Sequence, residues 1–118
     1  MNKAENKVVI FPAKDNLKGL TREEFLIRLK ETVEARVEEC YIFGSFANGK
    51  FSSNSDVDII LIQKTDVPFL DRGKEFLDLY EIGPPLDLLI YTPEEFKALL
   101  KENQGFWKSV KESLTKVF

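Results

Sequence analysis

Three aspartates and one glycine-serine pair are the residues of this sequence whose types and spacing could do chemistry. Asp56 and Asp58 lie two residues apart at the head of an apolar segment. Side chains two residues apart on a strand point to the same face, so both carboxylates can reach one site. Two carboxylates this close repel each other unless a cation lies between them. Mg²⁺ suits that position because it prefers oxygen ligands and shares its shell with substrate phosphates.

Asp87 and the Gly44-Ser45 pair extend this chemistry toward phosphate transfer. Asp87 stands in the apolar run Pro-Leu-Asp-Leu-Leu-Ile, where solubility does not require a carboxylate. If its strand lies beside that of Asp58, it can hold a second Mg²⁺ and take a proton from an attacking hydroxyl. Gly44 lets the backbone approach a ligand closely. A helical turn that begins at Ser45 would present N–H groups and a hydroxyl to a phosphate.

Each of these features also has a simpler explanation. In a chain with 20 acidic residues, an Asp-x-Asp is usually a solvated strand end. A Gly-Ser pair is usually a plain turn, and an Asp beside prolines is usually a turn or cap residue. These explanations weaken because all three features occur at predicted strand ends in this order, with residues 46–55 separating the Gly-Ser pair from Asp56.

The spacing of apolar residues predicts the elements that position these groups. Residues 21–24 have the form of a capping box, and Phe25, Leu29 and Val33 then make one apolar stripe of a helix. The pattern indicates a mixed α/β (α+β) domain, a small mixed sheet packed with helices. Further along we expect strands over 37–43, 56–62 and 86–91, with a loop over 44–55 that contains a helical turn after Ser45. We also expect helices over 69–80 and from Thr92 to about Lys101, and a last amphipathic stripe over 107–117.

Length and composition bound the class of protein. The 118 residues suit a single domain over 1–118, in which residues 1–20 form an extension where Val8 to Phe11 could make an edge strand. With no His and one Cys, the sequence excludes His-based catalysis, His-ligated metals and a disulfide within the chain. A net charge of -3 argues against nucleic acid as a direct partner. No apolar run approaches the roughly 20 residues of a membrane span and no signal-peptide pattern is present, so we expect a cytoplasmic protein without a membrane partner.

The combined pattern resembles a known family. Residues 44–49 (Gly-Ser-Phe-Ala-Asn-Gly), residues 55–59 (Ser-Asp-Val-Asp-Ile) and the isolated Asp87 are similar to the signature of the minimal nucleotidyltransferases, short members of the DNA polymerase beta-like nucleotidyltransferase superfamily. The resemblance covers roughly residues 37–110 and is fairly specific because it joins three separated elements. It implies a nucleotidyltransferase-like fold.

The resemblance also implies a role for each motif residue. Gly44 and Ser45 would contact the triphosphate of a nucleotide. Asp56, Asp58 and Asp87 would ligate two Mg²⁺ ions, and Asp87 would also be the base. The reaction would be attack of an acceptor hydroxyl on the α-phosphate of a nucleoside triphosphate, with AMP transferred from ATP and pyrophosphate leaving.

The same resemblance bears on partners. Many minimal nucleotidyltransferases pair with a helical protein of the HEPN type in toxin–antitoxin systems, so such a partner could be the acceptor. An alternative stays open: the chain could be a non-catalytic antitoxin or nucleotide-binding module that acts by direct contact. Three clustered negative charges argue against a pure binder, since it gains little from them. The sequence also leaves self-association open.

Overall fold

The computed structural model describes residues 17–52 and 54–118, so the strand expected at Val8 to Phe11 lies outside the described residues. The architecture is the mixed α/β arrangement predicted from the sequence. In chain order the elements are α1 (Arg22–Val33), β1 (Glu39–Phe43), α2 (Gly44–Asn48), β2 (Val57–Ile62), η3 (Phe69–Ile82), β3 (Leu86–Tyr91), α3 (Pro93–Leu99), α4 (Gly105–Ser113) and β4 (Thr115–Lys116).

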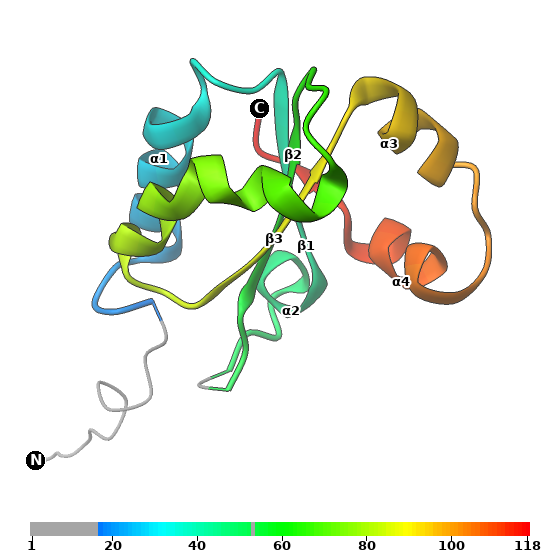
Figure 1. Cartoon of the computed structure of the whole chain (residues 1–118). Coiled ribbons are helices and arrows are strands. Elements are labelled where there is room, and N and C mark those ends of the chain that lie inside the picture. Colours follow the sequence, from blue (N-terminus) through cyan, green and yellow to red (C-terminus); the bar gives the residue numbers. More distant parts are fainter. Residues whose placement is uncertain (1–16, 53) are drawn as a thin grey trace, which may run out of the picture.

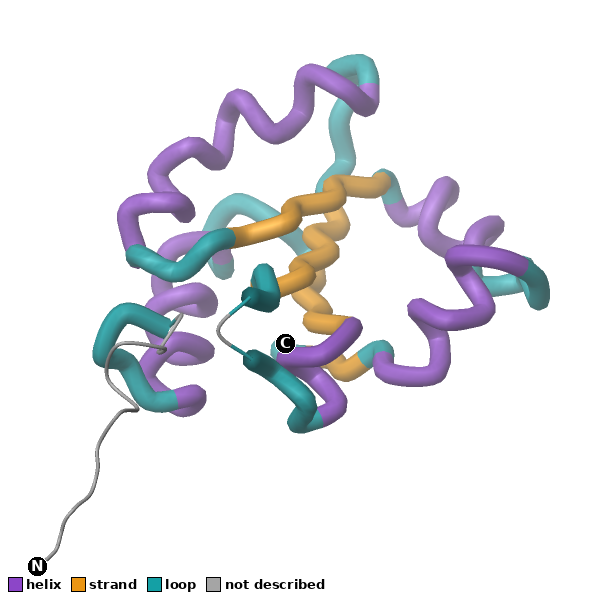
Figure 2. Tube along the Cα trace, turned by 90° about the horizontal axis from the view of Figure 1, so that it is seen from below, coloured by secondary structure: helices purple, strands orange, loops and turns teal. Residues whose placement is uncertain are grey.

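The four strands form one mixed sheet with the spatial order β3-β2-β1-β4. Strand β2 runs parallel to β3, whereas β1 is antiparallel to both β2 and β4. A parallel pair needs a crossover connection, and η3 supplies it between β2 and β3. Helices α1 and η3 cover one face of the sheet, and α3 and α4 cover the other (Figures 1 and 2).

The two faces of the sheet bury two separate apolar clusters. Along β2, Val57, Ile59 and Leu61 join the cluster under α1 and η3, whereas Ile60 and Ile62 join the cluster under α3 and α4. This alternation explains why β2 reads as apolar on both faces. The helices complete the clusters with Phe25, Leu29, Val33, Phe76 and Leu79 on the first face, and with Phe96, Trp107 and Val110 on the second.

The two predicted helix starts are confirmed by their capping geometry. At the head of α1, the Thr21 hydroxyl accepts the N–H of Glu24 at 3.0 Å, and the Glu24 carboxylate accepts the N–H of Thr21 at 2.8 Å. Thr92 and Glu95 form the same reciprocal pair before α3. Helix α3 ends at Leu99, slightly before the predicted end. None of the helices in the described residues is long and apolar enough to cross a membrane.

The helix predicted over 69–80 is present but differs in type and length. It consists of two 3₁₀ segments that together continue to Ile82 and are separated by a kink at Phe76, where φ is -121° and ψ is 23°. Gly73 weakens an α-helix at this place, as the sequence indicates. Long uninterrupted 3₁₀ runs are uncommon, in line with the break at Phe76. The kink accompanies the burial of both Phe76 and Leu79 against the sheet.

The amphipathic stripe predicted over 107–117 is wrong in its second half. Helix α4 ends at Ser113, and the chain then extends as β4, where Thr115 and Lys116 pair with Ile42 and Tyr41 of β1. Strand β1 would otherwise leave its outer backbone groups without partners, and β4 satisfies some of them. Tertiary pairing therefore overrides the helical period of the last residues.

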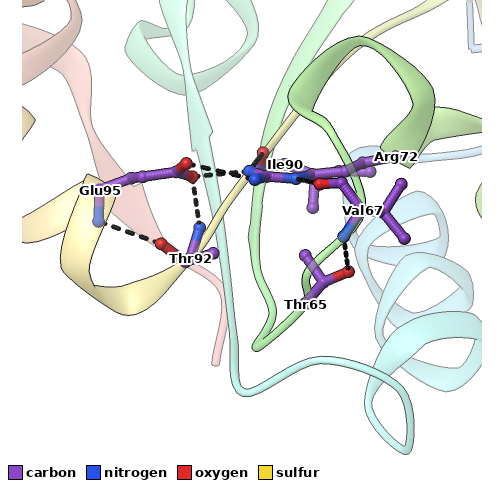
Figure 3. Close-up of polar contacts among 6 residues, drawn as sticks. All are labelled: Thr65, Val67, Arg72, Ile90, Thr92 and Glu95. Atoms are coloured by element: carbon purple, nitrogen blue, oxygen red, sulfur yellow. Dashed lines mark hydrogen bonds and ion pairs between the residues drawn. The ribbon is translucent and has the colours of Figure 1, made fainter.

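A buried arginine ties η3, β3 and α3 together, as Figure 3 shows. Arg72 is only 6% exposed. Its guanidinium donates to the carbonyl of Val67 at 2.8 Å and to the carbonyl of Ile90 at 3.1 Å. Two further bonds, of 2.6 Å and 3.2 Å, reach both carboxylate oxygens of Glu95. The contact at Ile90 fixes β3, the strand that carries Asp87.

Candidate active site

Asp58 and Asp87 lie directly opposite each other on two neighbouring strands. The register of β2 and β3 pairs Asp58 with Asp87, and the register of β1 and β2 pairs Asp58 with Phe43. Residues paired across a sheet point to the same face. That face is the one on which Ile60 packs under α3 and α4. The structure thus brings Asp87 to Asp58, as the sequence predicted for two adjacent strands.

The three aspartates differ in burial, and Asp58 is the most enclosed. It is half-buried and is the one residue of β2 that is not fully buried, while Asp56, just before the strand, and Asp87 are exposed. Burial, together with the negative charges of Asp87 and Asp56, raises the pKa of Asp58 to about 6. In the described residues no ion pair involves any of the three carboxylates. No lysine or arginine in the described part of the chain therefore pairs with them to offset their mutual repulsion.

Gly44 is required by the position of the Asp58 carboxylate. Its φ is +73°, a conformation that favours glycine. A Cβ placed on Gly44 would lie 3.4 Å from Asp58 Cγ and far inside van der Waals contact of Oδ2. The sequence indicated that Gly44 admits a ligand; in the structure, the group that approaches its backbone is the Asp58 side chain.

Helix α2 begins at Gly44, one residue earlier than predicted. Its N-cap residue, Phe43, has no side-chain acceptor to offer. The Gly44 N–H instead donates to the hydroxyl oxygen of Ser113 at 2.7 Å. Ser45 is half-buried, and within the described residues its hydroxyl makes no hydrogen bond. Ser45, next to Gly44 in the chain, therefore offers a hydroxyl donor that no other described residue uses.

With this geometry in place, the sequence was compared with known proteins. The sequence model of the nucleotidyltransferase domain matches residues 22–117. The chain belongs to this family. This nucleotidyltransferase is 29% identical over 91 residues to a protein of Methanocaldococcus jannaschii named "Putative protein adenylyltransferase". The match covers 76% of this chain and 87% of that protein.

Two solved structures are similar to this nucleotidyltransferase. A crystal structure titled as a "putative nucleotidyltransferase" from Sulfolobus solfataricus is 30% identical and has a TM-score of 0.48, with coverage of 69% of this chain and 82% of that chain. A crystal structure titled "the toxin-antitoxin with AMP-PNP" is 19% identical, with a TM-score of 0.54 and coverage of 84% and 73%. At that identity, the second likeness concerns the fold alone.

The carboxylates of this nucleotidyltransferase fit a magnesium ion by their chemistry. In the described part of the chain, no three acidic or cysteine side chains already stand close enough to form a metal cage. Mg²⁺ does not need one, because it is commonly held by one or two carboxylates together with waters and substrate phosphates. Asp58 and Asp87 lie opposite each other and have no cationic partner among the described residues, so they meet this requirement. Asp56 lies near enough for its charge to raise the pKa of Asp58.

Two residues that support the Gly44 turn were missed from the sequence. Ser113 lies 69 positions from Gly44 along the chain. The Arg22 guanidinium donates to the carbonyl of Phe46 and lies 4.4 Å from the centre of its ring. Phe46 is itself buried against Phe25, with ring centres 5.5 Å apart. No local pattern marks Ser113 or Arg22, since each acts through a contact distant in sequence.

The loop between the two motifs is held by its own polar side chains. Gly49 ends α2 in the left-handed conformation, with φ of +82°. The Asn48 side chain accepts the N–H of Lys50 at 3.0 Å. Ser52 and Ser55 then close a turn, with their hydroxyl oxygens 3.1 Å apart. These contacts carry the chain from α2 to Asp56 at the head of β2.

Proposed function

We propose that this nucleotidyltransferase uses Mg²⁺ to transfer AMP from ATP to a hydroxyl of a protein acceptor. The observation that carries the proposal is the pairing of Asp58 with Asp87 beside the Gly44 turn. A half-buried carboxylate that faces a second carboxylate is costly for a structural role alone. A bound cation would remove that cost. Cation binding therefore explains why two carboxylates face each other at this position, which packing alone does not explain.

In this proposal Asp56, Asp58 and Asp87 hold two magnesium ions. When bound, the ions neutralise charge on the attacking and leaving oxygens of an in-line displacement. Asp87 is exposed and so can reach an acceptor hydroxyl and take its proton. The acceptor oxygen forms a bond to the α-phosphorus, the bond from that phosphorus to pyrophosphate breaks, and the proton stays on the Asp87 carboxylate. Catalysis then comes mainly from positioning and charge neutralisation.

Gly44 and Ser45 are proposed to contact the triphosphate. The Ser45 hydroxyl is half-buried and uncommitted within the described residues, which suits a donor to a phosphate oxygen. The Gly44 N–H is already donated to Ser113, so its contribution is a backbone without a side chain next to Asp58. Gly44 therefore leaves room for the Asp58 carboxylate beside the proposed phosphate site.

The proposed acceptor is a protein because the relative in Methanocaldococcus jannaschii carries the name "Putative protein adenylyltransferase". A helical partner of the HEPN type, with this chain as its antitoxin, follows from the resemblance in the motifs. A structure with the same fold carries a title that names a toxin–antitoxin and AMP-PNP. ATP and a toxin partner are therefore the first substrates to test.

The experiment is a transfer assay with ATP labelled at the α-phosphate. Purified protein with Mg²⁺ should label itself, a helical partner or a small hydroxyl acceptor. Asp56→Asn combined with Asp58→Asn should reduce labelling by about 100-fold or more, because the ligands of the ions are lost. Asp66→Asn is the matched control and should leave labelling unchanged, because Asp66 is an exposed aspartate in the loop between β2 and η3.

The outcome also separates an enzyme from a binder. If the double variant neutralises a toxic partner as well as the wild-type chain does, and neither labels it, the chain acts by direct contact. Labelling that survives the double variant would contradict the proposed role of the carboxylates.

A further inference from the structure

We propose that Ser113 is a positioning residue that sets the Gly44 turn for nucleotide binding; this inference rests on the proposed function. The Ser113 hydroxyl oxygen accepts the N–H of Gly44 at 2.7 Å, across 69 positions of the chain. Gly44 is the first residue of α2 and lies against the Asp58 carboxylate. One hydroxyl from the end of α4 thus contacts the residue that links the predicted phosphate turn to the predicted metal ligands.

Ser113 supplies an acceptor for the first N–H of α2, a helix without a side-chain cap. Serine is among the residues that normally cap a helix start from the preceding position. Here that position is Phe43, whose side chain makes no capping hydrogen bond. Without Ser113, the half-buried N–H of Gly44 would lose its acceptor and the turn would lose a restraint. A glycine at this point has more backbone freedom than any other residue, so the restraint matters there.

The backbone that carries the Ser113 side chain is held on both sides. On one side, α4 is anchored in the core by Trp107 and Val110, both buried. On the other side, the Thr115 hydroxyl donates to the Ser113 carbonyl at 2.9 Å, and β4 pairs with β1. Helix α4 and strand β4 therefore hold the Ser113 hydroxyl oxygen in a defined position, as a positioning residue requires.

The test compares Ser113→Ala with Ser113→Thr, which keeps an acceptor oxygen, and with Ser109→Ala. Ser109 is an exposed serine one helical turn earlier, without a hydrogen bond from its hydroxyl in the described residues, so it is the matched control. Two quantities are measured on each folded variant: hydrogen exchange of the Gly44 amide by NMR, and the Kd for AMP-PNP with Mg²⁺.

Ser113→Ala should speed exchange of the Gly44 amide and weaken AMP-PNP binding by about 5- to 10-fold, the worth of one hydrogen bond. Ser113→Thr should restore most of both, and Ser109→Ala should change neither. Unchanged Gly44 exchange in Ser113→Ala would show that the bond is not made. Faster exchange with unchanged Kd would show that the bond is only structural. Either result overturns the inference.

The same data separate this inference from the proposed function. If the wild-type chain binds no AMP-PNP, the proposed function fails, and a positioning role in nucleotide binding fails with it. If the wild-type chain binds AMP-PNP but Ser113→Ala binds equally well, only the inference fails. Transfer of labelled AMP onto Ser113 itself would make it an acceptor and would also overturn the positioning role.

Discussion

At the scale of single residues, the site depends on one aspartate inside an apolar strand. Asp58 is flanked in β2 by Val57 and Ile59, which are fully buried. Its own side chain points to the opposite face, toward Asp87 on β3. Burial and two neighbouring negative charges raise its pKa to about 6. A carboxylate in this setting keeps its proton to a higher pH than usual, and a nearby cation would stabilise its ionised form.

The raised pKa predicts how Asp58→Asn changes stability without metal. A folded pKa above the ordinary value means that the fold loses stability as pH rises through about 4 to about 6 and the carboxylate ionises. The Asn side chain has nearly the same size as that of Asp but carries no charge. We expect the variant to be more stable than the wild-type chain by about 1 kcal/mol at pH 7.5, a figure reduced for the half-exposed position, and equal to it near pH 4.

Chemical denaturation in the presence of EDTA at both pH values measures this difference. Asp66→Asn, at an exposed loop position, should show no comparable gain. A destabilised Asp58→Asn at pH 7.5 would mean that the ionised carboxylate is satisfied within the fold and needs no cation.

Gly44 and Gly49 provide a matched pair for the role of the glycine. Their φ angles are +73° and +82°, so alanine costs about 1 kcal/mol of backbone strain at either position. Only at Gly44 does the added Cβ meet another group, the Asp58 carboxylate. Gly44→Ala should therefore destabilise by about 1–3 kcal/mol more than Gly49→Ala and should lose nucleotide binding. Equal melting temperatures and equal Kd values for AMP-PNP would contradict this account of Gly44.

At the scale of elements, β3 is placed by contacts on both of its edges. One edge pairs with β2, and at the other edge the Arg72 guanidinium donates a hydrogen bond to the carbonyl of Ile90. The pKa of Glu95 is held below its ordinary value, first by its hydrogen bond from Arg72 and then by that from Thr92. The Arg72–Glu95 ion pair therefore contributes stability at neutral pH and loses it as acid protonates Glu95.

Arg72→Met should destabilise the fold by about 2 kcal/mol at pH 7, because two carbonyls and a carboxylate lose their donor. The loss should shrink as pH falls through the lowered pKa of Glu95. Lys74→Met on the same helix is the control: its ion pair with Asp71 is exposed, so the change should stay within about 0.5 kcal/mol. Urea unfolding at several pH values measures both. Equal losses in the two variants would show that Arg72 does not tie these elements.

The elements also show how far local sequence signals reach. The capping box at residues 21–24 and the N-cap Thr92, followed by Pro93, placed two helix starts. The apolar run over 86–91 matched β3 residue for residue. Local signals did not give the 3₁₀ form of η3 or the switch from α4 to β4. Both depend on tertiary demands: burial of two side chains across a kink, and the unpaired edge of β1.

At the scale of the whole molecule, the sheet order brings the motifs to one place. Because β2 lies between β1 and β3, Gly44 directly after β1 and Asp87 on β3 both come next to Asp58. The sequence predicted these residues from their spacing, since each sits at a recognisable strand end. It could not predict Ser113 or Arg22, which support the turn from elements far away in the chain and carry no local signal.

The most direct test of the central claim is the titration of the Asp58 carboxyl by carbon-13 NMR, with and without Mg²⁺ and AMP-PNP. Without the ion we expect a midpoint near pH 6, and with Mg²⁺ and AMP-PNP we expect it to fall well below that value, because a bound cation favours the ionised form. Asp87→Asn should weaken this response. A midpoint that does not move when Mg²⁺ and AMP-PNP are added would contradict the account.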